Sequence, residues 1–351
     1  MIQRLRWPIS KAAALWLAVL VITWLLSNHG RALSKAFDAR WVIKYPPGWR
    51  LPLKDEISNA MKWLIEDASF GLFSFTELTR GISWLIEQPY NLALALFADG
   101  IVEGYGLDAI QILPPLSWIF VIALVISLGH FAKDWWLASL VGGAFFYLAV
   151  FGQWESAMIT LASIIIAVPF GVGGGLLLGI SAFKWRWVDK LLGPILDLMQ
   201  TIPIFAYLVP ILFMFGFGPV SALIATIIYA MPPMVRVTTL ALRSVPSETQ
   251  DFGVMAGCTA KQMLWKVLIP SSKSALMVGV NQVIMLSLNM VIIASMIGAG
   301  GLGYDVLASL RRLDIGGGIE AGVAIVVLAI ALDRLSQAFA QRRVSHHSKD
   351  N

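Results

Sequence analysis

Long apolar runs without a charged side chain constrain this sequence more than any other feature. A helix that crosses a lipid bilayer needs about 20 mostly apolar residues, because lipid offers no hydrogen-bond partner to a bare backbone amide. Windows of such length lack Asp, Glu, Lys and Arg at residues 12–30, 109–132, 135–154, 156–183, 198–235 and 274–304. The sequence therefore predicts an all-α polytopic membrane protein.

Two further features raise the number of expected spans. Residues 198–235 are long enough for two helices, and Gly216-Phe217-Gly218-Pro219 supplies a turn between them. A last helix over residues 318–336 would place Glu320 and Asp333 near opposite membrane interfaces. We therefore expect about eight transmembrane helices.

The composition excludes other classes of protein. Apolar residues make up 58% of the 351 residues and charged residues only 13%, whereas soluble domains carry about 25% charged residues. A single cysteine, Cys258, excludes a disulfide scaffold. The net charge of +5 is explained by basic loops beside a membrane, so a lipid bilayer is the expected surrounding and nucleic acid is not an expected partner.

The distribution of basic residues predicts the orientation. An even number of spans places both termini on one side, where Lys and Arg exceed Asp and Glu, while the short loops opposite hold only Arg311 and Arg312 as basic residues. Both termini are therefore expected in the cytoplasm. Residues 1–30 could be a signal peptide or an anchor, and the poor cleavage site at residues 23–28 favours a transmembrane anchor.

Residues 31–108 are more polar than the rest of the chain. Two amphipathic patterns at helical spacing lie within them, formed by Ile57, Met61, Leu64 and Ile65 and by Leu78, Ile82 and Leu85. We expect an external or interfacial amphipathic helical segment that packs on the bundle. A surface that receives substrate or a partner is the alternative interpretation.

Three glycines recur at every fourth position, at Gly171, Gly175 and Gly179. Such a ridge lets a second helix approach closely, and it indicates helix packing rather than a pore lining. No internal duplication is visible, so a two-fold channel would need a second copy of the chain.

The loop at residues 236–273 is the largest expected on the cytoplasmic side, and it has the pattern of two short helices. Ser247 can cap the first helix and Gly257 can end it, because glycine adopts a positive φ at low cost. Thr259 can cap the second helix, over residues 260–269, and Pro270 can help to stop it.

Apolar side chains on this loop have two interpretations. Phe252, Val254 and Met255 stand on an otherwise polar first helix. Exposed, they would indicate a protein partner; otherwise they would pack on the ends of the bundle.

Motifs for nucleotide or metal chemistry are absent from the sequence. It has no G-x-x-x-x-G-K-[ST] loop and no H-E-x-x-H, and its four histidines are scattered. We therefore expect no catalytic residue, no metal and no cofactor bound by this chain. A bundle of this kind is either passive or draws energy from a partner.

The cytoplasmic loop resembles a known signature. Asp251-Phe252-Gly253, three residues, Gly257, nine residues and then Val267-Leu268-Ile269-Pro270 is similar to the "EAA" signature of binding-protein-dependent ABC importer permeases. That signature has Glu-Ala-Ala, three residues, Gly, nine residues, Ile, one residue and Leu-Pro. The Gly and Pro positions match, Val267 and Ile269 are conservative, and the opening triplet differs.

Further stretches resemble the glycine betaine/proline permease subunits of bacteria, in the quaternary-amine branch of ABC importers. The resemblance covers about residues 100–337. The matching stretches are Asp197–Pro203, Tyr207–Pro210, Met231–Pro233, Gly279–Gln282, Gly300–Gly303 and Leu332–Leu335. It implies a type I ABC importer permease domain over residues 109–337, a cytoplasmic tail over 338–351 and a bacterial inner-membrane location.

The resemblance also implies partners and a mechanism. A homodimer of this chain would join an ABC ATPase, which holds ATP and Mg²⁺, and an external substrate-binding protein. Residues 251–257 would be the coupling helix docked on the ATPase, with Phe252 as an anchor. The solute would be glycine betaine, proline betaine, choline or carnitine; the alternatives are another small solute, such as an amino acid or sulfonate, or a passive channel or scaffold.

Two groups of residues are candidates for the route of the solute. Polar side chains that could line a path are Gln200, Asn281, Gln282 and Asn289; hydrogen bonding between helices is the alternative for each. Glycines that could form an outer gate are Gly300, Gly301 and Gly303. A tight turn is the alternative for the glycines.

Overall fold

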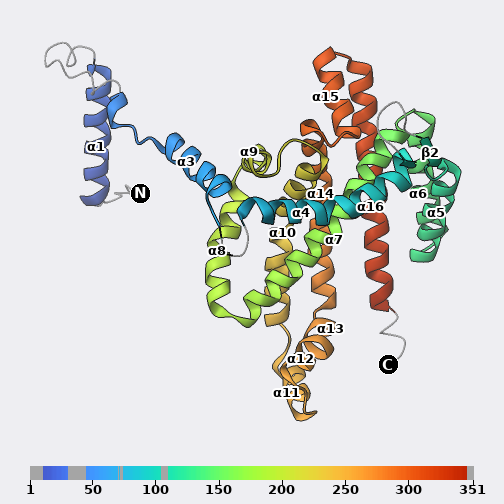
Figure 1. Ribbon diagram of the computed structural model, residues 1–351. Helices are drawn as coiled ribbons and strands as arrows, with labels where there is room; N and C mark the ends of the chain where they lie inside the picture. The colour runs from blue at the N-terminus through green and yellow to red at the C-terminus, as the bar shows by residue number, and fades with distance from the viewer. Residues whose placement is uncertain (1–10, 31–44, 70, 72–73, 104–109, 346–351) are drawn as a thin grey trace, which may run out of the picture. The chain divides into compact units, whose positions relative to one another are not determined.

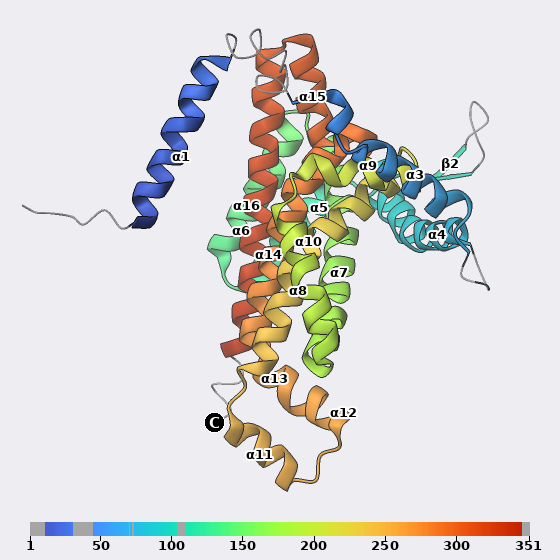
Figure 2. The same ribbon diagram turned by 90° about the vertical axis from the view of Figure 1, so that its left-hand side faces the viewer.

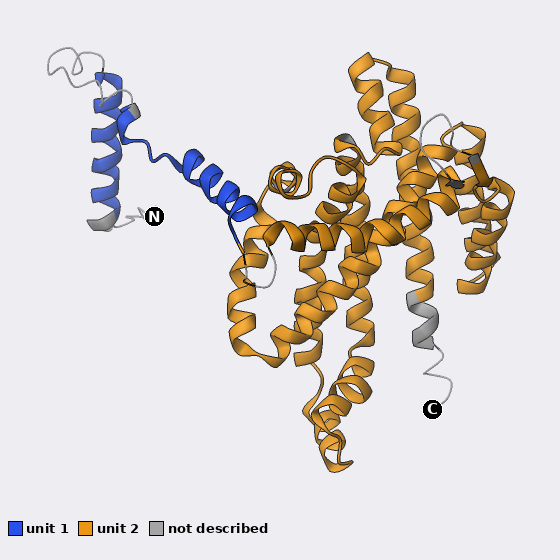
Figure 3. Ribbon diagram, viewed as in Figure 1, with its two compact units in different colours: residues 1–68 blue, residues 69–351 orange. Residues whose placement is uncertain are grey.

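The computed structural model describes residues 11–30, 45–69, 71, 74–103 and 110–345 (Figure 1). It divides into two compact units, residues 1–68 and 69–351 (Figure 3). The first amphipathic pattern of residues 31–108 therefore lies in unit 1 and the second lies in unit 2.

The described part of unit 1 contains three helical elements: α1 Lys11–Asn28, the 3-10 turn η2 Pro47–Trp49 and α3 Leu53–Glu66. Asp55 and Glu56 lie in the first turn of α3, where negative charge favours the helix start. Most of the large apolar side chains described in α1 are exposed, as expected for a helix that faces lipid.

Unit 2 begins with an amphipathic helix, α4 Phe75–Leu94, which starts at a capping box between Ser74 and Glu77. It is followed by a π-helical turn, η3 Ala95–Asp99, and an antiparallel pair of strands, β1 Ile101–Glu103 and β2 Ile110–Leu113.

Helix α4 has two apolar faces. The predicted positions Leu78, Ile82 and Leu85 are exposed, while Ile86 and Tyr90 are buried and pack against apolar residues of α7, α9 and α10. The helix therefore packs on the bundle through a face that the sequence pattern did not single out, because the buried set is rotated around the helix from the predicted one.

The remaining long elements form the bundle. They are α5 Trp118–Ala132, α6 Trp135–Val150, α7 Trp154–Lys184, α8 Arg186–Thr201, α9 Ile204–Phe215, α10 Pro219–Arg243, α14 Lys273–Ala294, α15 Leu302–Arg312 and α16 Ile315–Ser345. Figures 1 and 2 show that the axes of α10, α14 and α16 are roughly aligned, with α14 running opposite to α10 because the segment between them turns the chain back.

The all-α membrane fold is confirmed, but fewer helices than eight have full spanning length. Among the described residues, four helices are long and apolar enough to cross a membrane: α7, α10, α14 and α16. The pair α8 and α9, bent by 116°, makes five if it forms one span, and the apolar helices Ala13–Asn28, α5 and α6 are shorter.

Glycine and proline explain the shortened spans. Pro114 and Pro115 precede α5, so its window yields helix only from Trp118 onwards. Gly152, at a φ of +70°, turns the chain between α6 and α7. Pro203 pushes Ile202 into an extended conformation, which separates α8 from α9.

The predicted glycine ridge lies at a close contact between α7 and α10. A β-carbon added at Gly175 would lie 2.6 Å from Met234 Cβ, and one added at Gly179 would lie 2.5 Å from Thr238 Cβ. Both partners belong to α10, which also packs against α14. The ridge therefore serves helix packing, as the spacing predicted.

Candidate coupling loop and translocation surface

The segment between α10 and α14 projects from one end of the bundle (Figures 1 and 2). It contains α11 Ser247–Met255, α12 Ala260–Gln262, a π-helical stretch η5 Met263–Leu268 and α13 Ile269–Ser271. The last three elements are continuous, so the segment consists of two helical arms joined by a turn. We call this segment the coupling loop.

The turn between the arms follows the sequence prediction. Gly257 has a φ of +73° and ends α11. The Cys258 N–H donates to the Gly253 carbonyl at 3.0 Å, and Thr259 forms a capping box with Gln262. The positive φ of Gly257 and the caps on both sides of the turn therefore set the angle between the two helical arms.

The prediction that Ser247 caps α11 is wrong. Ser247 is the first residue of the helix, and Pro246 occupies the cap position without a side-chain hydrogen bond. Gln250 Nε2 donates to the Val245 carbonyl at 2.9 Å and ties the helix back to the preceding residues. Pro246 leads the chain into α11 in an extended conformation, and the helix starts without a cap from a serine side chain.

Pro270 does not stop the second arm at residue 269. The backbone stays helical through Ser271, and the Ile269 N–H donates to the Leu264 carbonyl, five residues earlier. This wider π-type bonding gives the proline ring more room than an α-helix would. Ser272 then donates through Oγ to the Ala241 carbonyl at 3.0 Å, which fastens the arm to α10.

One set of signature residues holds the loop together. Gly253 is buried, and a β-carbon there would lie 2.7 Å from Met263 Cε and 3.3 Å from Val267 Cγ2. Ile269 packs with Leu242 and other buried residues at the end of α10. The small residue at position 253 therefore lets the two arms touch.

Another set of residues faces outwards. Asp251 is exposed, and the side chains of Phe252, Val254 and Met255 are 67%, 66% and 80% exposed. The apolar residues therefore do not pack on the bundle, which was one of the two interpretations. Exposed apolar side chains clustered on one short helix are typical of a docking surface.

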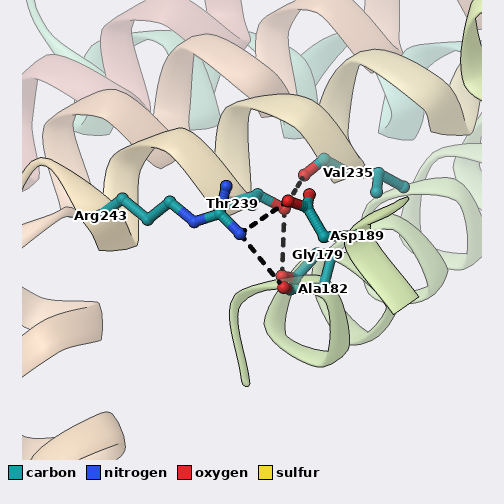
Figure 4. Close-up of polar contacts among 6 residues, drawn as sticks. All are labelled: Gly179, Ala182, Asp189, Val235, Thr239 and Arg243. Carbon is teal, nitrogen blue, oxygen red and sulfur yellow. Dashed lines mark hydrogen bonds and ion pairs between the residues drawn. The ribbon is translucent and has the colours of Figure 1, made fainter. Parts of the chain in front are cut away.

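A polar cluster joins α7, α8 and α10 close to the coupling loop (Figure 4). Thr239 Oγ1 donates to the Gly179 carbonyl at 3.1 Å, and Arg243 forms an ion pair with Asp189 at 2.9 Å. Arg236, about two turns before Arg243 on α10, forms an ion pair with Asp197 of α8. These residues also border a cavity of about 280 Å³.

Sequence reasoning missed these ion pairs, although a signal for them exists. Arg236 and Arg243 are seven residues apart on α10, and Asp189 and Asp197 are eight apart on α8. Each spacing places both charges near one helix face, so the two faces carry complementary charge. The match could have predicted that α8 lies against α10.

The structure separates the candidate path residues. Asn281 Oδ1 accepts a hydrogen bond from Ser336 Oγ of α16 at 3.2 Å, which is the alternative given for it. Gln282 and Asn289 are exposed on α14, seven residues apart and so on one face, and Gln200 is exposed near the end of α8. The structure therefore does not bring Asn281 together with the other three.

The candidate gate glycines lie in a tightly packed turn. Gly300 and Gly301 have φ values of +68° and +77°. The Leu302 N–H donates to Thr160 Oγ1 at 3.0 Å, and a β-carbon at Gly303 would lie 2.3 Å from the Ile292 carbonyl oxygen. This packing favours a tight turn over a flexible gate.

Comparison with known proteins is consistent with this geometry. The model of the family "Binding-protein-dependent transport system inner membrane component" matches residues 171–345. The glycine betaine transport system permease protein OpuAB of Bacillus subtilis is 35% identical over 84% of this chain and 97% of its own length. This chain belongs to that family. It is therefore a multi-pass inner-membrane component of a transport system.

Other relatives of this permease component have related names. The glycine betaine/proline betaine permease protein ProW of Escherichia coli is 39% identical over 74% of this chain and 73% of its own length. The trimethylamine N-oxide permease protein TmoV of Pelagibacter ubique is 43% identical over 77% of this chain. The chain spans only 38% of that relative, and 45% of the TmoV protein of Ruegeria pomeroyi.

Solved structures of a methionine ABC transporter, MetNI, in inward-facing conformations also align with this permease component. The alignment covers 54% of this chain and 92% of the other, with 21% identity and a TM-score of 0.46. Membership of the family therefore rests on the sequence relatives.

Proposed function

We propose that this chain is the permease subunit of an ATP-driven importer for small compatible solutes of the glycine betaine class. The observation that carries the proposal is the coupling loop, which keeps its two arms packed through Gly253 while it exposes Phe252 and Met255. A passive channel has no need for a rigid loop with an outward apolar face. The names of the relatives support the solute class.

In this proposal the chain itself is not an enzyme and binds no cofactor. A separate ABC ATPase holds ATP and Mg²⁺, and its closure moves the coupling loop as a lever. The lever then shifts α10 and α14, from which it projects, and the bundle alternates between inward-open and outward-open forms. Phe252 acts as the anchor in the docking contact.

The remaining partners follow from the same proposal. An external binding protein delivers the solute, and two copies of this chain enclose the path, with both termini in the cytoplasm. Gln282 and Asn289 support a path beside α14, because two polar side chains on an exposed face of an apolar helix are costly against lipid.

A second candidate solute is trimethylamine N-oxide, which relatives that are 37% and 43% identical are named for. This compound and glycine betaine both carry a positively charged nitrogen that bears three methyl groups. The negative oxygen is bonded directly to that nitrogen in trimethylamine N-oxide and belongs to a carboxylate one methylene away in glycine betaine. Such ligands cannot donate N–H hydrogen bonds, and aromatic faces suit their methylated cation.

Uptake measurements in the native host test both candidates. We expect deletion of the chain to abolish ATP-dependent uptake of labelled glycine betaine, and the plasmid-borne chain to restore it. Excess unlabelled trimethylamine N-oxide, choline and taurine are then added one at a time. Strong competition only by trimethylamine N-oxide would favour the second candidate, and unchanged uptake after deletion would refute the proposal.

A further inference from the structure

A second polar pocket lies between the turn that joins α5 and α6 and helix α16, and it shares no lining residue with the coupling loop or with the cluster at α8. It has a volume of about 360 Å³. The turn between α5 and α6 contributes Lys133, Asp134 and Trp136, and α16 contributes Arg334 and Gln337. Neither the coupling loop nor the candidate path uses any of these residues.

The two cations of this pocket are not neutralised by the protein. Among the residues that the structure describes, Lys133 and Arg334 form no ion pair with a carboxylate. Both are exposed. The pocket therefore presents two positive charges that remain available to an anionic ligand.

The carboxylates next to these cations in sequence, Asp134 in the lining of the pocket and Asp333, are already engaged in local hydrogen bonds. Asp134 Oδ1 accepts the Leu137 N–H at 2.9 Å and caps α6. Both carboxylate oxygens of Asp333 accept from Gln337 Nε2 at 2.8 Å. These bonds hold the negative groups in place and leave the Lys133 and Arg334 side chains free to face a ligand.

The pocket lies where the apolar part of each helix ends. Helix α5 ends at Ala132 and α6 begins at Trp135, while the apolar run of α16 ends at Leu332, just before Asp333. Leu140 and Ile330 line the same pocket. The lining therefore changes from apolar to cationic, as the boundary between lipid tails and headgroups does.

Exposed tryptophans mark the same boundary. The side chains of Trp135 and Trp136 are 70% and 72% exposed, and the Trp135 ring lies 4.2 Å from the His130 ring, centroid to centroid. Tryptophan favours the headgroup level of a bilayer, and basic pockets between membrane helices bind acidic headgroups.

We propose that this pocket binds the phosphate of an anionic phospholipid headgroup through Lys133 and Arg334, with the acyl region against Leu140 and Ile330. The apolar part of the lining and the flanking tryptophans favour a lipid over free phosphate. The bound lipid fastens the hairpin of α5 and α6 to α16, beside the direct packing between α6 and α16.

Native mass spectrometry of the full-length chain, purified with its natural partners, tests the proposal. Dioleoylphosphatidylglycerol and dioleoylphosphatidylcholine are titrated separately and bound lipids are counted. We expect preferential binding of the anionic lipid, weakened about tenfold or more in the Lys133→Gln/Arg334→Gln variant. The Arg311→Gln/Arg312→Gln variant removes the same charge at the turn between α15 and α16 and should bind as the unmodified chain does.

Two further variants keep the result interpretable if the first variant folds poorly. Lys133→Arg/Arg334→Lys keeps both charges and should retain binding, while Leu140→Trp fills the pocket without changing charge and should reduce it. Equal losses in the pocket and control variants, or equal binding of the two lipids, would overturn the proposal. Displacement of phosphatidylglycerol by inorganic phosphate alone would show a free-anion site and would also overturn it.

Discussion

The seam between α7 and α10 and the coupling loop both depend on glycine, but for opposite physical reasons. At Gly179 the φ is ordinary for a helix and space is missing, since a β-carbon would lie 2.8 Å from the Val235 carbonyl oxygen. At Gly257 space is open on all sides, and the φ of +73° is what a side chain resists.

This difference indicates what each region does. The backbones of α7 and α10 approach closely at Gly175 and Gly179, so we expect the two helices to move as one body. The coupling loop has few neighbours, and its shape is set by one backbone turn and the contact at Gly253. The loop can therefore keep its shape while it presents Phe252 to a partner. This arrangement suits a segment that transmits movement to the packed helices α7 and α10.

Breaking the seam should have the largest effect. Gly179→Ala should destabilise the folded chain by about 1–3 kcal/mol through overpacking. Gly173→Ala, on the same helix with nothing within 4 Å of the added carbon, should be neutral or stabilise by about 0.5–1 kcal/mol, because alanine is the better helix former. Thermal unfolding in detergent measures both, and equal effects would contradict the packing argument.

Changing the turn of the coupling loop should have the next largest effect. Gly257→Val places a β-branched residue at positive φ and should cost about 1–2 kcal/mol. Transport per ATP hydrolysed should fall as the arms change angle. Gly152→Val is the matched control, because Gly152 has a φ of +70° and open space in the turn between α6 and α7.

The readout separates the two glycine variants. Both should lose similar stability, and only Gly257→Val should uncouple ATP hydrolysis from uptake in reconstituted transporters. Normal coupling in a properly folded Gly257→Val complex would rule out the lever as described.

The contact between α8 and α10 differs from the glycine-dependent contact between α7 and α10, because it relies on charge rather than on close packing. Asp197 is 69% exposed in its pair with Arg236, so the pair should contribute at most about 1 kcal/mol and lose strength in high salt. A double-mutant cycle with Asp197→Asn and Arg236→Gln measures the coupling energy. A salt-independent coupling well above that value would show that α8 is held as rigidly as α7.

The smallest expected difference lies between two neighbouring threonines of α10. Thr239 Oγ1 donates to Gly179 and Val235 carbonyls, whereas the buried Thr238 Oγ1 has no hydrogen-bond partner in the described structure. Thr239→Val should cost about 0.5–1.5 kcal/mol, and Thr238→Val should be neutral or stabilising. The reverse order, measured by thermal unfolding, would mean that the assigned hydrogen bonds do not matter.

Much of the fold follows from local patterns in the sequence. Charge-free windows predicted where helices lie, and four-residue spacing predicted the seam, because both depend on periodicity within one helix. Gly257 and Thr259 were predicted correctly as a stop and a cap for the same reason. Helix lengths were overestimated where Pro114, Pro115 and Pro203 interrupt apolar sequence.

Contacts between distant helices were harder to predict. The pairing of Asp189 with Arg243 depends on how α8 folds back after α7, and the charge spacing indicates it only when the two helices are compared with each other. Likewise, Asn281 was a candidate for the path together with Gln282 and Asn289, but its side chain accepts a hydrogen bond from Ser336 of α16, a contact that no pattern within α14 states. The exposed face of α4 could not be told from its packed face for a similar reason.

Purification of the tagged chain from its native membranes tests the central claim most directly, with associated proteins quantified by mass spectrometry. We expect an ABC ATPase in stoichiometric amount with the unmodified chain and with Phe217→Ala, which truncates an aromatic side chain that is 84% exposed outside the coupling loop. Phe252→Ala should lose most of the ATPase. A chain that is recovered alone, or a Phe252→Ala variant that retains the full amount, would contradict the account.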